Sequence, residues 1–140
     1  MKFEHIAITG GGGRLGRFVV AECASHAAVT ILDLKPGDSG HAFVALDVLD
    51  LDAVRRALEG HGAVIHLAAI DDAIEAPQKA YFETNVEGTF NVLQAAHELG
   101  ITRAAIASST SALGLGDDKP DYMPRYYPID ESHPLTPHDA

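Results

Sequence analysis

A β-branched apolar run that leads directly into glycines is the feature that most constrains the fold of this sequence. Residues 6–9 read Ile-Ala-Ile-Thr and predict a strand, four glycines follow, and an amphipathic segment begins at Arg14. Gly10, Gly13 and Gly16 have the spacing Gly-x-x-Gly-x-x-Gly, although the run also contains Gly-x-Gly-x-x-Gly. Both spacings indicate a strand–turn–helix that binds a pyrophosphate, and a flexible glycine-rich turn or hairpin is the alternative at this point.

A carboxylate at the end of a second predicted strand supports dinucleotide binding. Residues 14–25 repeat apolar side chains three and four positions apart, as in a helix, and residues 29–32 form an apolar run that ends at Asp33. Asp33 follows Gly13 by 20 residues, a separation at which a carboxylate accepts hydrogen bonds from the adenosine ribose hydroxyls. NAD is therefore expected rather than NADP, whose 2′-phosphate would meet a like charge. Lys35 weakens that preference and leaves NADP open, and the alternative for Asp33 is an ordinary strand-end carboxylate.

Strand and helix patterns alternate over the rest of the sequence. The alternation predicts an α/β fold of the Rossmann type, a doubly wound parallel sheet covered by helices on both faces. The apolar residues of the long helix predicted at 78–99 are expected to lie on one broad face of that helix. They are Phe82, Val86, Phe90, Val92, Leu93 and Ala96. Strands are expected at 41–46, 63–69 and 102–107, and helices at 52–59 and 78–99.

The composition of the sequence changes after Gly114. Residues 1–114 are expected to form a dinucleotide-binding core, in which the fifth strand ends in the hydroxyl cluster 108–111. A Ser/Thr-rich turn that caps the strand is the alternative for that cluster. Residues 115–140 are rich in proline and predict an irregular active-site or substrate loop, because long irregular loops in compact domains are usually functional.

The net charge of −10 argues against two classes of partner. A nucleic acid or an anionic membrane surface would repel a chain with 20 acidic and 10 basic residues. Cys23 is the only cysteine, and no signal peptide or run of about 18 apolar residues is present, so a soluble cytoplasmic protein is expected. The histidines show no metal-ligand spacing, so no metal is expected, and His66 is predicted to be a hydrogen-bonded strand residue.

Together these motifs resemble the extended short-chain dehydrogenase/reductases, also called the NAD-dependent epimerase/dehydratase family. The resemblance covers essentially the whole sequence, and residues 9–16 are similar to the family's Thr-Gly-x-x-Gly-x-x-Gly. Residues 47–48 resemble its adenine-contacting pair, residues 66–69 the strand end along the cofactor, and residues 85–89 the helix signature whose asparagine supports the cofactor site. The nucleotide-binding residues that the resemblance implies are Gly10, Gly13, Arg14, Leu15, Gly16, Asp33, Asp47, Val48, Leu67, Ala68, Ala69, Asn85 and Ser108.

The resemblance also implies a catalytic hydroxyl. Residues 108–114 are similar to the family's Ser-Ser-x-x-Val-Tyr-Gly, which makes Ser109 the catalytic residue, although Leu113 stands where the family often has tyrosine. The family moves its proton with a downstream Tyr-x-x-x-Lys, and no tyrosine of this sequence has a lysine four positions later. We therefore expect these 140 residues to be the N-terminal part of a longer enzyme, to stop before its general acid/base and to be inactive alone.

For the intact protein, the resemblance implies five parallel strands in the order 3-2-1-4-5 before any further strands, and the fold is truncated after the fifth. It implies an NAD-dependent oxidoreductase or an epimerase/dehydratase acting on a hydroxyl or keto group of a sugar, sugar nucleotide or polyol. It further implies a homodimer, with bare apolar surface around Phe90 and Leu93 when the chain is alone. The alternative is a non-catalytic NAD(P)-binding or redox-sensing module, and the sequence after Ala140 distinguishes the two.

Overall fold

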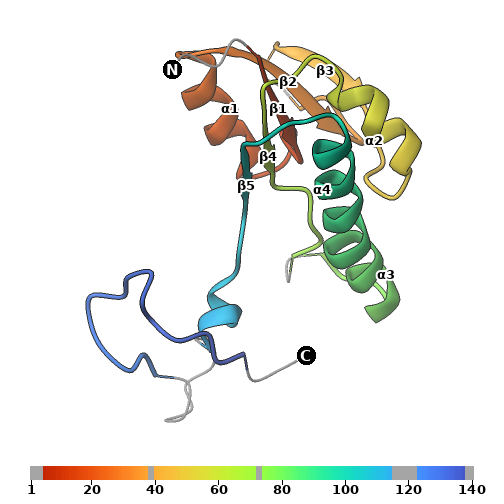
Figure 1. Ribbon diagram of the computed structural model, residues 1–140. Helices are drawn as coiled ribbons and strands as arrows, with labels where there is room; N and C mark the ends of the chain where they lie inside the picture. Colours follow the sequence, from red (N-terminus) through yellow and green to blue (C-terminus); the bar gives the residue numbers. More distant parts are fainter. Residues whose placement is uncertain (1–4, 38–39, 72–73, 115–122, 138–140) are drawn as a thin grey trace. The chain divides into compact units, whose positions relative to one another are not determined.

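The computed structural model of the protein describes residues 5–37, 40–71, 74–114 and 123–137. The chain divides into two compact units, Met1–Ile106 and Ala107–Ala140. The strand order β3-β2-β1-β4-β5, with all neighbours parallel, confirms the predicted Rossmann-type α/β fold. This sheet forms the first unit (Figure 1), and its strands are β1 (His5–Thr9), β2 (Ala28–Asp33), β3 (Ala42–Ala45), β4 (Ala63–His66) and β5 (Ala104–Ile106).

Helices cover both faces of the sheet. On one face lies α1 (Gly16–Ala24), and on the other lie α2 (Leu51–Leu58) and a long composite helix (Figure 1). The composite helix consists of α3 (Gln78–Phe82), a π-helical turn η1 (Glu83–Glu87) and α4 (Gly88–Glu98). The two faces therefore bury separate hydrophobic cores.

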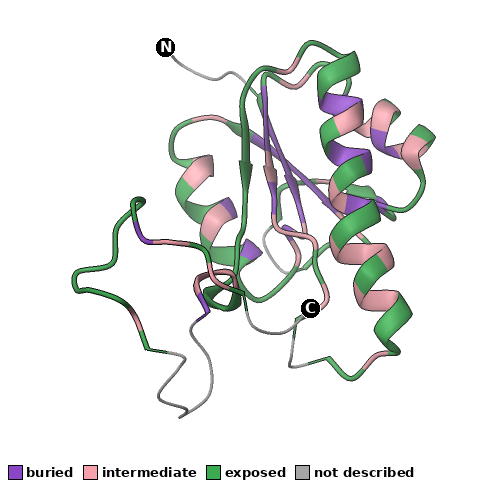
Figure 2. Cartoon of the chain, turned by 60° about the horizontal axis from the view of Figure 1, so that its bottom comes forward, coloured by how far each residue is buried: buried purple, intermediate pink, exposed green. Residues whose placement is uncertain are grey.

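Alternate residues of β1 point into these two cores. Ile6 and Ile8 pack with Val20 of α1, whereas Ala7 packs with Val92 of α4 on the opposite face. Because both faces are covered, the strand has an unbroken apolar sequence instead of alternating apolar and polar residues. Figure 2 shows the central strands buried between helices whose inner sides are buried and whose outer sides are exposed.

The strands are shorter than the sequence predicted. The expected strand 63–69 ends at His66, and the expected strand 102–107 covers only Ala104–Ile106. The reason is that β1 ends at Thr9 and β5 at Ile106, so residues 67–69 have no neighbouring strand to pair with. Leu67 N still donates to the Thr9 carbonyl at 3.0 Å, and the chain leaves the carboxyl edge of the sheet after this contact.

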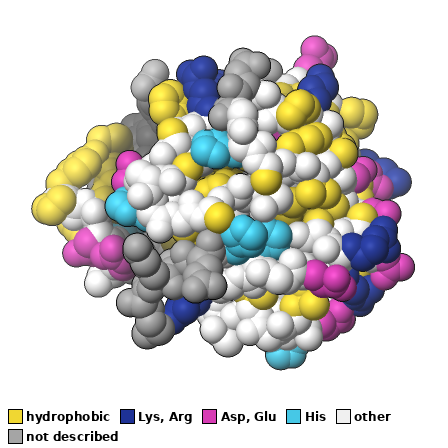
Figure 3. All heavy atoms as spheres, turned by 90° about the horizontal axis from the view of Figure 1, so that it is seen from above, with side chains coloured by type: hydrophobic (Ala, Val, Ile, Leu, Met, Phe, Trp, Pro, Cys, Tyr) yellow, Lys and Arg dark blue, Asp and Glu magenta, His cyan; other side chains and the backbone are white. Residues whose placement is uncertain are grey.

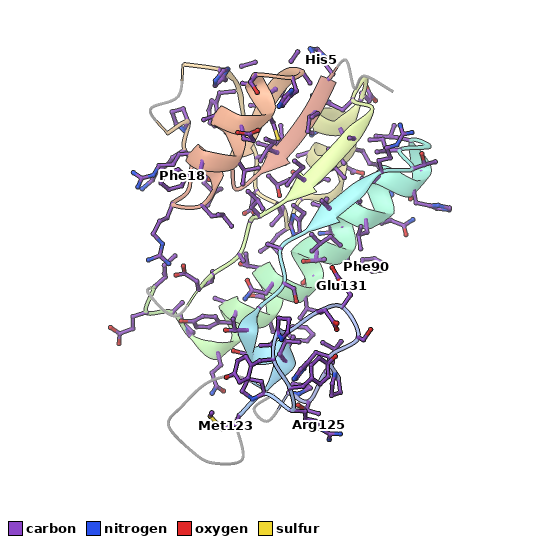
Figure 4. The ribbon with its side chains drawn as sticks, turned by 90° about the vertical axis from the view of Figure 1, so that its left-hand side faces the viewer. His5, Phe18, Phe90, Met123, Arg125 and Glu131 are labelled. Carbon is purple, nitrogen blue, oxygen red and sulfur yellow. The ribbon has the colours of Figure 1, made fainter. Side chains whose placement is uncertain are left out.

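The long helix buries Val92 and Ala96 of the apolar face that the sequence predicted, but not the larger residues of that face. Its buried residues are Gly88, Asn91, Val92, Ala95 and Ala96. The larger apolar residues lie outside, and Figure 4 shows Phe90 on the outer side of α4. At its start the helix lies close to the loop between β3 and α2, because a Cβ on Gly88 would be 2.6 Å from Val48 Cγ2. The exposed apolar stripe consists of Phe82, Val86, Phe90 and Leu93, which are 64%, 52%, 62% and 37% exposed.

An ion pair between Arg55 and Glu98 joins α2 to α4. Arg55 of α2 donates to Glu98 of α4 at 2.5 Å and to Asp52 at 2.7 Å. The hydrogen bonds from Arg55 and Gln94 lower the pKa of the Glu98 carboxyl to about 2. Acidic and basic side chains are interspersed on the side of the molecule that carries these helices (Figure 3), so the surface there has no patch of a single charge. Contacts this exposed add little stability each.

The second unit is mostly irregular in its described part. It contains a short 3₁₀ turn, η2 (Thr110–Leu113), and a loop folded around the buried side chain of His133. His133 Nε2 accepts a hydrogen bond from Arg125 N at 3.1 Å, and His133 Nδ1 lies 3.0 Å from the Pro134 carbonyl. Across the described ranges of both units, no helix has the length and apolar character needed to span a membrane.

Candidate nucleotide-binding site

The ends of three strands meet at the carboxyl edge of the sheet. Thr9, the last residue of β1, pairs with Leu32 on one side and with His66 on the other. Open α/β sheets bind their ligands at this edge, in the crevice outside the carboxyl ends of the strands. The predicted site residues of the first unit follow these strand ends.

The glycine turn after β1 is packed too tightly for side chains at two of its predicted positions. Gly10 has φ +68°, and a Cβ there would lie 2.6 Å from Ala68 N. A Cβ on Gly16 would lie 2.3 Å from the Gly10 carbonyl oxygen, where α1 begins against the turn. The first contact brings residues 67–69 beside the turn, and the second sets the direction of the helix. Gly13 is different, because a Cβ there would meet only the Gly10 oxygen at 3.1 Å.

Asp33 is hydrogen-bonded to this turn. Its Oδ2 accepts from Gly12 N at 3.0 Å, and its Oδ1 lies 3.4 Å from Lys35 N. The structure thus brings the predicted ribose-binding carboxylate onto the predicted pyrophosphate-binding turn. Gly12 was not among the predicted site residues, yet a Cβ there would lie 2.4 Å from the Lys35 carbonyl oxygen. Sequence reasoning missed Gly12 because its role depends on a contact with Lys35, which lies 23 positions further along the chain.

The start of α1 fits an anionic ligand. No side chain caps this end of the helix, and its first turn contains no acidic residue, so the positive end of the helix dipole favours an anion such as a phosphate. An open groove beside the turn is lined by Gly12, Gly13, Arg14, Arg17, Val20, Ala21, Gly37 and His41. Arg17 brings positive charge to this groove, whereas the charge of Arg14 is balanced by Asp71. The residues present therefore fit a dinucleotide, with phosphate at the turn and ribose at Asp33.

Arg14 and Leu15 take different positions at the start of the helix. The guanidinium of Arg14 binds Asp71 Oδ2 at 2.5 Å, so it connects the turn to the loop that follows β4. Leu15 is 55% exposed and belongs to neither core. Both side chains are thus at the surface beside the turn.

Asn85 holds the same β4 loop from the other side. Its carboxamide oxygen accepts from Ile70 N at 2.8 Å, and its nitrogen donates to the Ile70 carbonyl at 2.9 Å. Asn85 lies in the π-helical turn η1, a local widening that is frequent at functional sites. The sequence predicted a regular helix here, since no residue pattern marks a π-turn.

His66 is buried in a hydrogen-bonded chain between the two sides of this site. Its Nδ1 lies 2.6 Å from Thr9 Oγ1, and its Nε2 lies 2.9 Å from Thr89 Oγ1. This confirms the predicted hydrogen-bonded strand residue. Burial lowers the pKa of His66 below 6.5, so the imidazole is neutral at pH 7.

The pH dependence of stability should reveal this buried neutral histidine. The unfolded chain binds a proton at a higher pH than the folded chain, because the pKa of His66 is lower in the folded state. The free energy of unfolding is therefore expected to fall as the pH decreases below about 6.5, with a slope from His66 of at most about 1.4 kcal/mol per pH unit. Urea titrations at a series of values from about pH 7.5 to about pH 5 measure this dependence. The free energy of unfolding should vary less steeply with pH in His66→Gln than in the parent protein. Equal slopes would contradict a neutral buried His66.

The remaining predicted residues of the first unit line the same edge. Asp47 Oδ1 accepts from Leu49 N at 3.0 Å, and the Asp47 side chain is exposed. The side chain of Val48 belongs to the core, and its carbonyl accepts from Asn91 Nδ2 at 3.0 Å. Of the residues after β4, Leu67 and Ala68 are half-buried and Ala69 is exposed.

Ser108 and Ser109 belong to the second unit. Both are exposed, and Ser109 Oγ accepts from Ser111 N at 3.1 Å at the start of η2. This contact leaves the hydroxyl hydrogen of Ser109 free to be donated elsewhere. No group of three or more side chains that could hold a metal ion occurs in the described part of the chain.

Comparison with known proteins agrees with this geometry. The model of the NAD dependent epimerase/dehydratase family matches residues 6–140. The chain belongs to this family. Members of the NAD dependent epimerase/dehydratase family that resemble it include sugar dehydrogenases and UDP-sugar epimerases.

Two relatives in Haloferax volcanii are sugar dehydrogenases. The NAD-dependent glucose-6-phosphate dehydrogenase is 36% identical over 136 residues, which cover 88% of this chain and 51% of that protein. The L-arabinose 1-dehydrogenase (NAD(P)(+)) is 40% identical over 105 residues, which cover 75% of this chain and 41% of that protein. The chain therefore spans about half or less of the length of these relatives.

A solved structure has the same fold. It is a short-chain dehydrogenase/reductase superfamily protein from Agrobacterium tumefaciens with bound NAD. It matches with a TM-score of 0.79 and 35% identity, covering 97% of this chain and 40% of that one.

Proposed function

We propose that the full-length protein containing this chain is an NAD-dependent oxidoreductase that acts on a hydroxyl or keto group of a sugar. The hydrogen bond from Gly12 N to Asp33 Oδ2 carries this proposal, because it joins a ribose-binding carboxylate to a phosphate-binding turn. The sugar dehydrogenases at 36% and 40% identity support the substrate class. In an epimerase the same site would oxidise and then re-reduce the sugar.

The chain's own residues divide the work at this site. The amides at the start of α1 bind the pyrophosphate, and Asp33 accepts hydrogen bonds from the adenosine ribose. Arg14 and Asn85 hold the β4 loop in place through Asp71 and Ile70. NAD, when bound, supplies the hydride acceptor. In the second unit, Ser108 is assigned to cofactor binding and Ser109 to catalysis, in which its hydroxyl donates to the substrate oxygen.

We also assign residues 115–140 to the substrate loop that follows the 1–114 core; of these, residues 115–122 and 138–140 lie outside the described part of the chain. A Tyr-x-x-x-Lys pair outside these 140 residues moves the proton, since no such pair occurs within them. The 140-residue chain is accordingly expected to have no activity by itself.

An NADH absorbance assay with the full-length protein tests the proposed function. A panel of aldoses, uronic acids, sugar phosphates and UDP-sugars is incubated with NAD, and the sugar products are analysed in parallel. Net NADH formation identifies a dehydrogenase. A changed sugar without net NADH identifies an epimerase or dehydratase. NAD binding without turnover of any sugar would favour the non-catalytic NAD(P)-binding or redox-sensing module.

Removal of the Asp33 carboxylate should weaken cofactor binding. Asp33→Ala is expected to reduce NAD affinity by about 10- to 100-fold, because charge-assisted hydrogen bonds contribute roughly 1.5–3 kcal/mol. Asp33→Asn should lose less NAD affinity than Asp33→Ala, since its amide oxygen can still accept from Gly12 N. Calorimetric titration with NAD and NADP gives both affinities. Asp52→Ala on α2 is the matched control for loss of one negative charge, and an unchanged NAD affinity in Asp33→Ala would exclude Asp33 from the site.

We also propose that the full-length protein is a cytoplasmic homodimer. The exposed stripe of Phe82, Val86, Phe90 and Leu93 supports the dimer, because exposed apolar patches on soluble proteins tend to be interaction surfaces. Cell fractionation tests the compartment.

Phe90→Glu should disrupt this dimer. A charge in the middle of a buried apolar interface remains without a partner, so the variant is expected to elute as a monomer in size-exclusion chromatography with light scattering. Phe18→Glu on α1 is a matched control, since Phe18 and Phe90 are both 62% exposed and lie on helices that cover opposite faces of the sheet. Loss of the dimer in both variants, or in neither, would contradict an interface on the composite helix.

A further inference from the structure

The hydroxyl of Thr89 determines which ring nitrogen of His66 carries hydrogen. Thr89 Oγ1 lies 2.7 Å from the Asn85 carbonyl, which can only accept, so Thr89 donates its one hydrogen there. Toward His66 Nε2, at 2.9 Å, Thr89 can then only accept. The hydrogen of this contact therefore belongs to His66 Nε2.

The hydroxyl of Thr9 determines the state of the other nitrogen. Thr9 Oγ1 faces the amide of Ala68 at 3.4 Å and that of Leu67 at 3.3 Å, and Leu67 shares its hydrogen with the Thr9 carbonyl at 3.0 Å; both amides can only donate. Its own hydrogen is left for His66 Nδ1 at 2.6 Å, which must then be an acceptor. If Nδ1 carried a proton, it would be a third donor to Thr9 Oγ1. The hydroxyl hydrogen of Thr9 could then no longer be donated to Nδ1. The neutral Nε2–H tautomer satisfies every group in the chain of contacts.

Both ends of this chain of contacts reach the nucleotide site. At one end Thr9 holds Leu67 and Ala68, and a Cβ on Gly10 of the glycine turn would lie 2.6 Å from Ala68 N. At the other end Thr89 binds the backbone of Asn85, whose side chain binds both backbone groups of Ile70. His66 thus stands between the two groups that position residues 67–70.

We propose that His66, as its Nε2–H tautomer, is a positioning residue that couples the π-turn at Asn85 to the residues after β4. The ring acts through Thr9 and Thr89 and does not itself contact the nucleotide. This inference rests on the proposed function, because the segment 67–70 matters for binding only if a dinucleotide lies along it.

A double-mutant cycle in the full-length protein tests the coupling. Thr9→Val and Thr89→Val each remove one hydroxyl with little change in shape, and each is expected to weaken NAD affinity about three- to tenfold. The double variant should bind NAD about as tightly as the weaker-binding single variant. Once the ring has lost its hydrogen bond on one side, the hydrogen bond on the other side no longer positions it. Thr30→Val, a change at a buried threonine of β2 outside these contacts, is the control and should bind NAD normally.

Ring and amide NMR signals give a second measurement that does not depend on NAD. Long-range ¹H–¹⁵N spectra of the parent protein at neutral pH should show hydrogen on His66 Nε2 and none on Nδ1. Thr89→Val should shift the amide signals of Leu67 and Ala68, which contact Thr9 and not Thr89. The opposite tautomer, a charged ring, unmoved amide signals or additive losses of NAD affinity would each overturn the inference. A parent protein that shows these NMR signals but binds no NAD would instead overturn the proposed function.

Discussion

Gly10→Ala is expected to destabilise the protein by about 2–5 kcal/mol and to abolish most NAD binding. Two causes add. The backbone of Gly10 has φ +68°, a conformation that costs a residue with a side chain roughly 1–2 kcal/mol. The new Cβ would also lie 2.6 Å from Ala68 N, which is backbone and cannot rotate away. Relief of that overlap would disturb the contact of Leu67 N with the Thr9 carbonyl at 3.0 Å.

Urea denaturation followed by circular dichroism measures the loss of stability. Gly62→Ala is the matched control, since a Cβ on Gly62 would have only the His5 carbonyl oxygen nearby, at 3.9 Å. The free energy of unfolding of that variant should lie within about 1 kcal/mol of the parent protein's value. A Gly10→Ala variant as stable as Gly62→Ala would show that the glycine turn and residues 67–69 do not pack as described.

Ser109→Ala is expected to lower kcat of the full-length enzyme by about 10- to 1,000-fold while leaving NAD affinity nearly unchanged. The proposed role explains this split, because a hydrogen bond to the reacting oxygen strengthens as charge develops in the transition state. In the structure Ser109 Oγ accepts from Ser111 N at 3.1 Å, which orients the oxygen and leaves its hydrogen to donate. Steady-state kinetics and calorimetry separate the two quantities.

Variants of the neighbouring hydroxyls test the assignment of Ser109. Ser109→Thr retains both the acceptor for Ser111 N and a hydroxyl hydrogen, so it should recover part of the activity. Thr110→Val and Ser111→Ala should retain most of the activity. If either of these abolished turnover while Ser109→Ala did not, the catalytic hydroxyl would be one of the neighbours.

The fold was predictable because its determinants are local in the sequence. The apolar run before Gly10 and the run before Asp33 each identify a buried strand, and the helix patterns between strands require parallel crossovers. The strand order β3-β2-β1-β4-β5 follows from such crossovers in the resembled family and was confirmed. Strand ends were less predictable, because pairing stops where the neighbouring strand stops, as it does at His66.

The buried face of the long helix shows where local patterns fail. Size and hydrophobicity placed Phe90 with Val92 on one apolar face, yet Val92 is fully buried and Phe90 is 62% exposed. The start of the helix lies too close to the loop after β3 for a side chain at Gly88, which meets Val48 there. An amphipathic pattern does not distinguish a face that packs on the sheet from an apolar face left on the surface.

The sequence by itself determined the order of strands and helices in this protein and placed Gly10 after the first strand, Gly16 at the start of the first helix and Asp33 at the end of the second strand. Only the tertiary structure decided which groups there bind one another. Gly12 meets Asp33 and Lys35, Arg14 meets Asp71, and the hydrogen-bonded chain through His66 joins residues 9, 66 and 89. The physical reason is range: backbone propensity and periodicity act over a few residues, whereas hydrogen bonds between side chains and distant groups form between whichever partners the packed fold brings within about 3 Å.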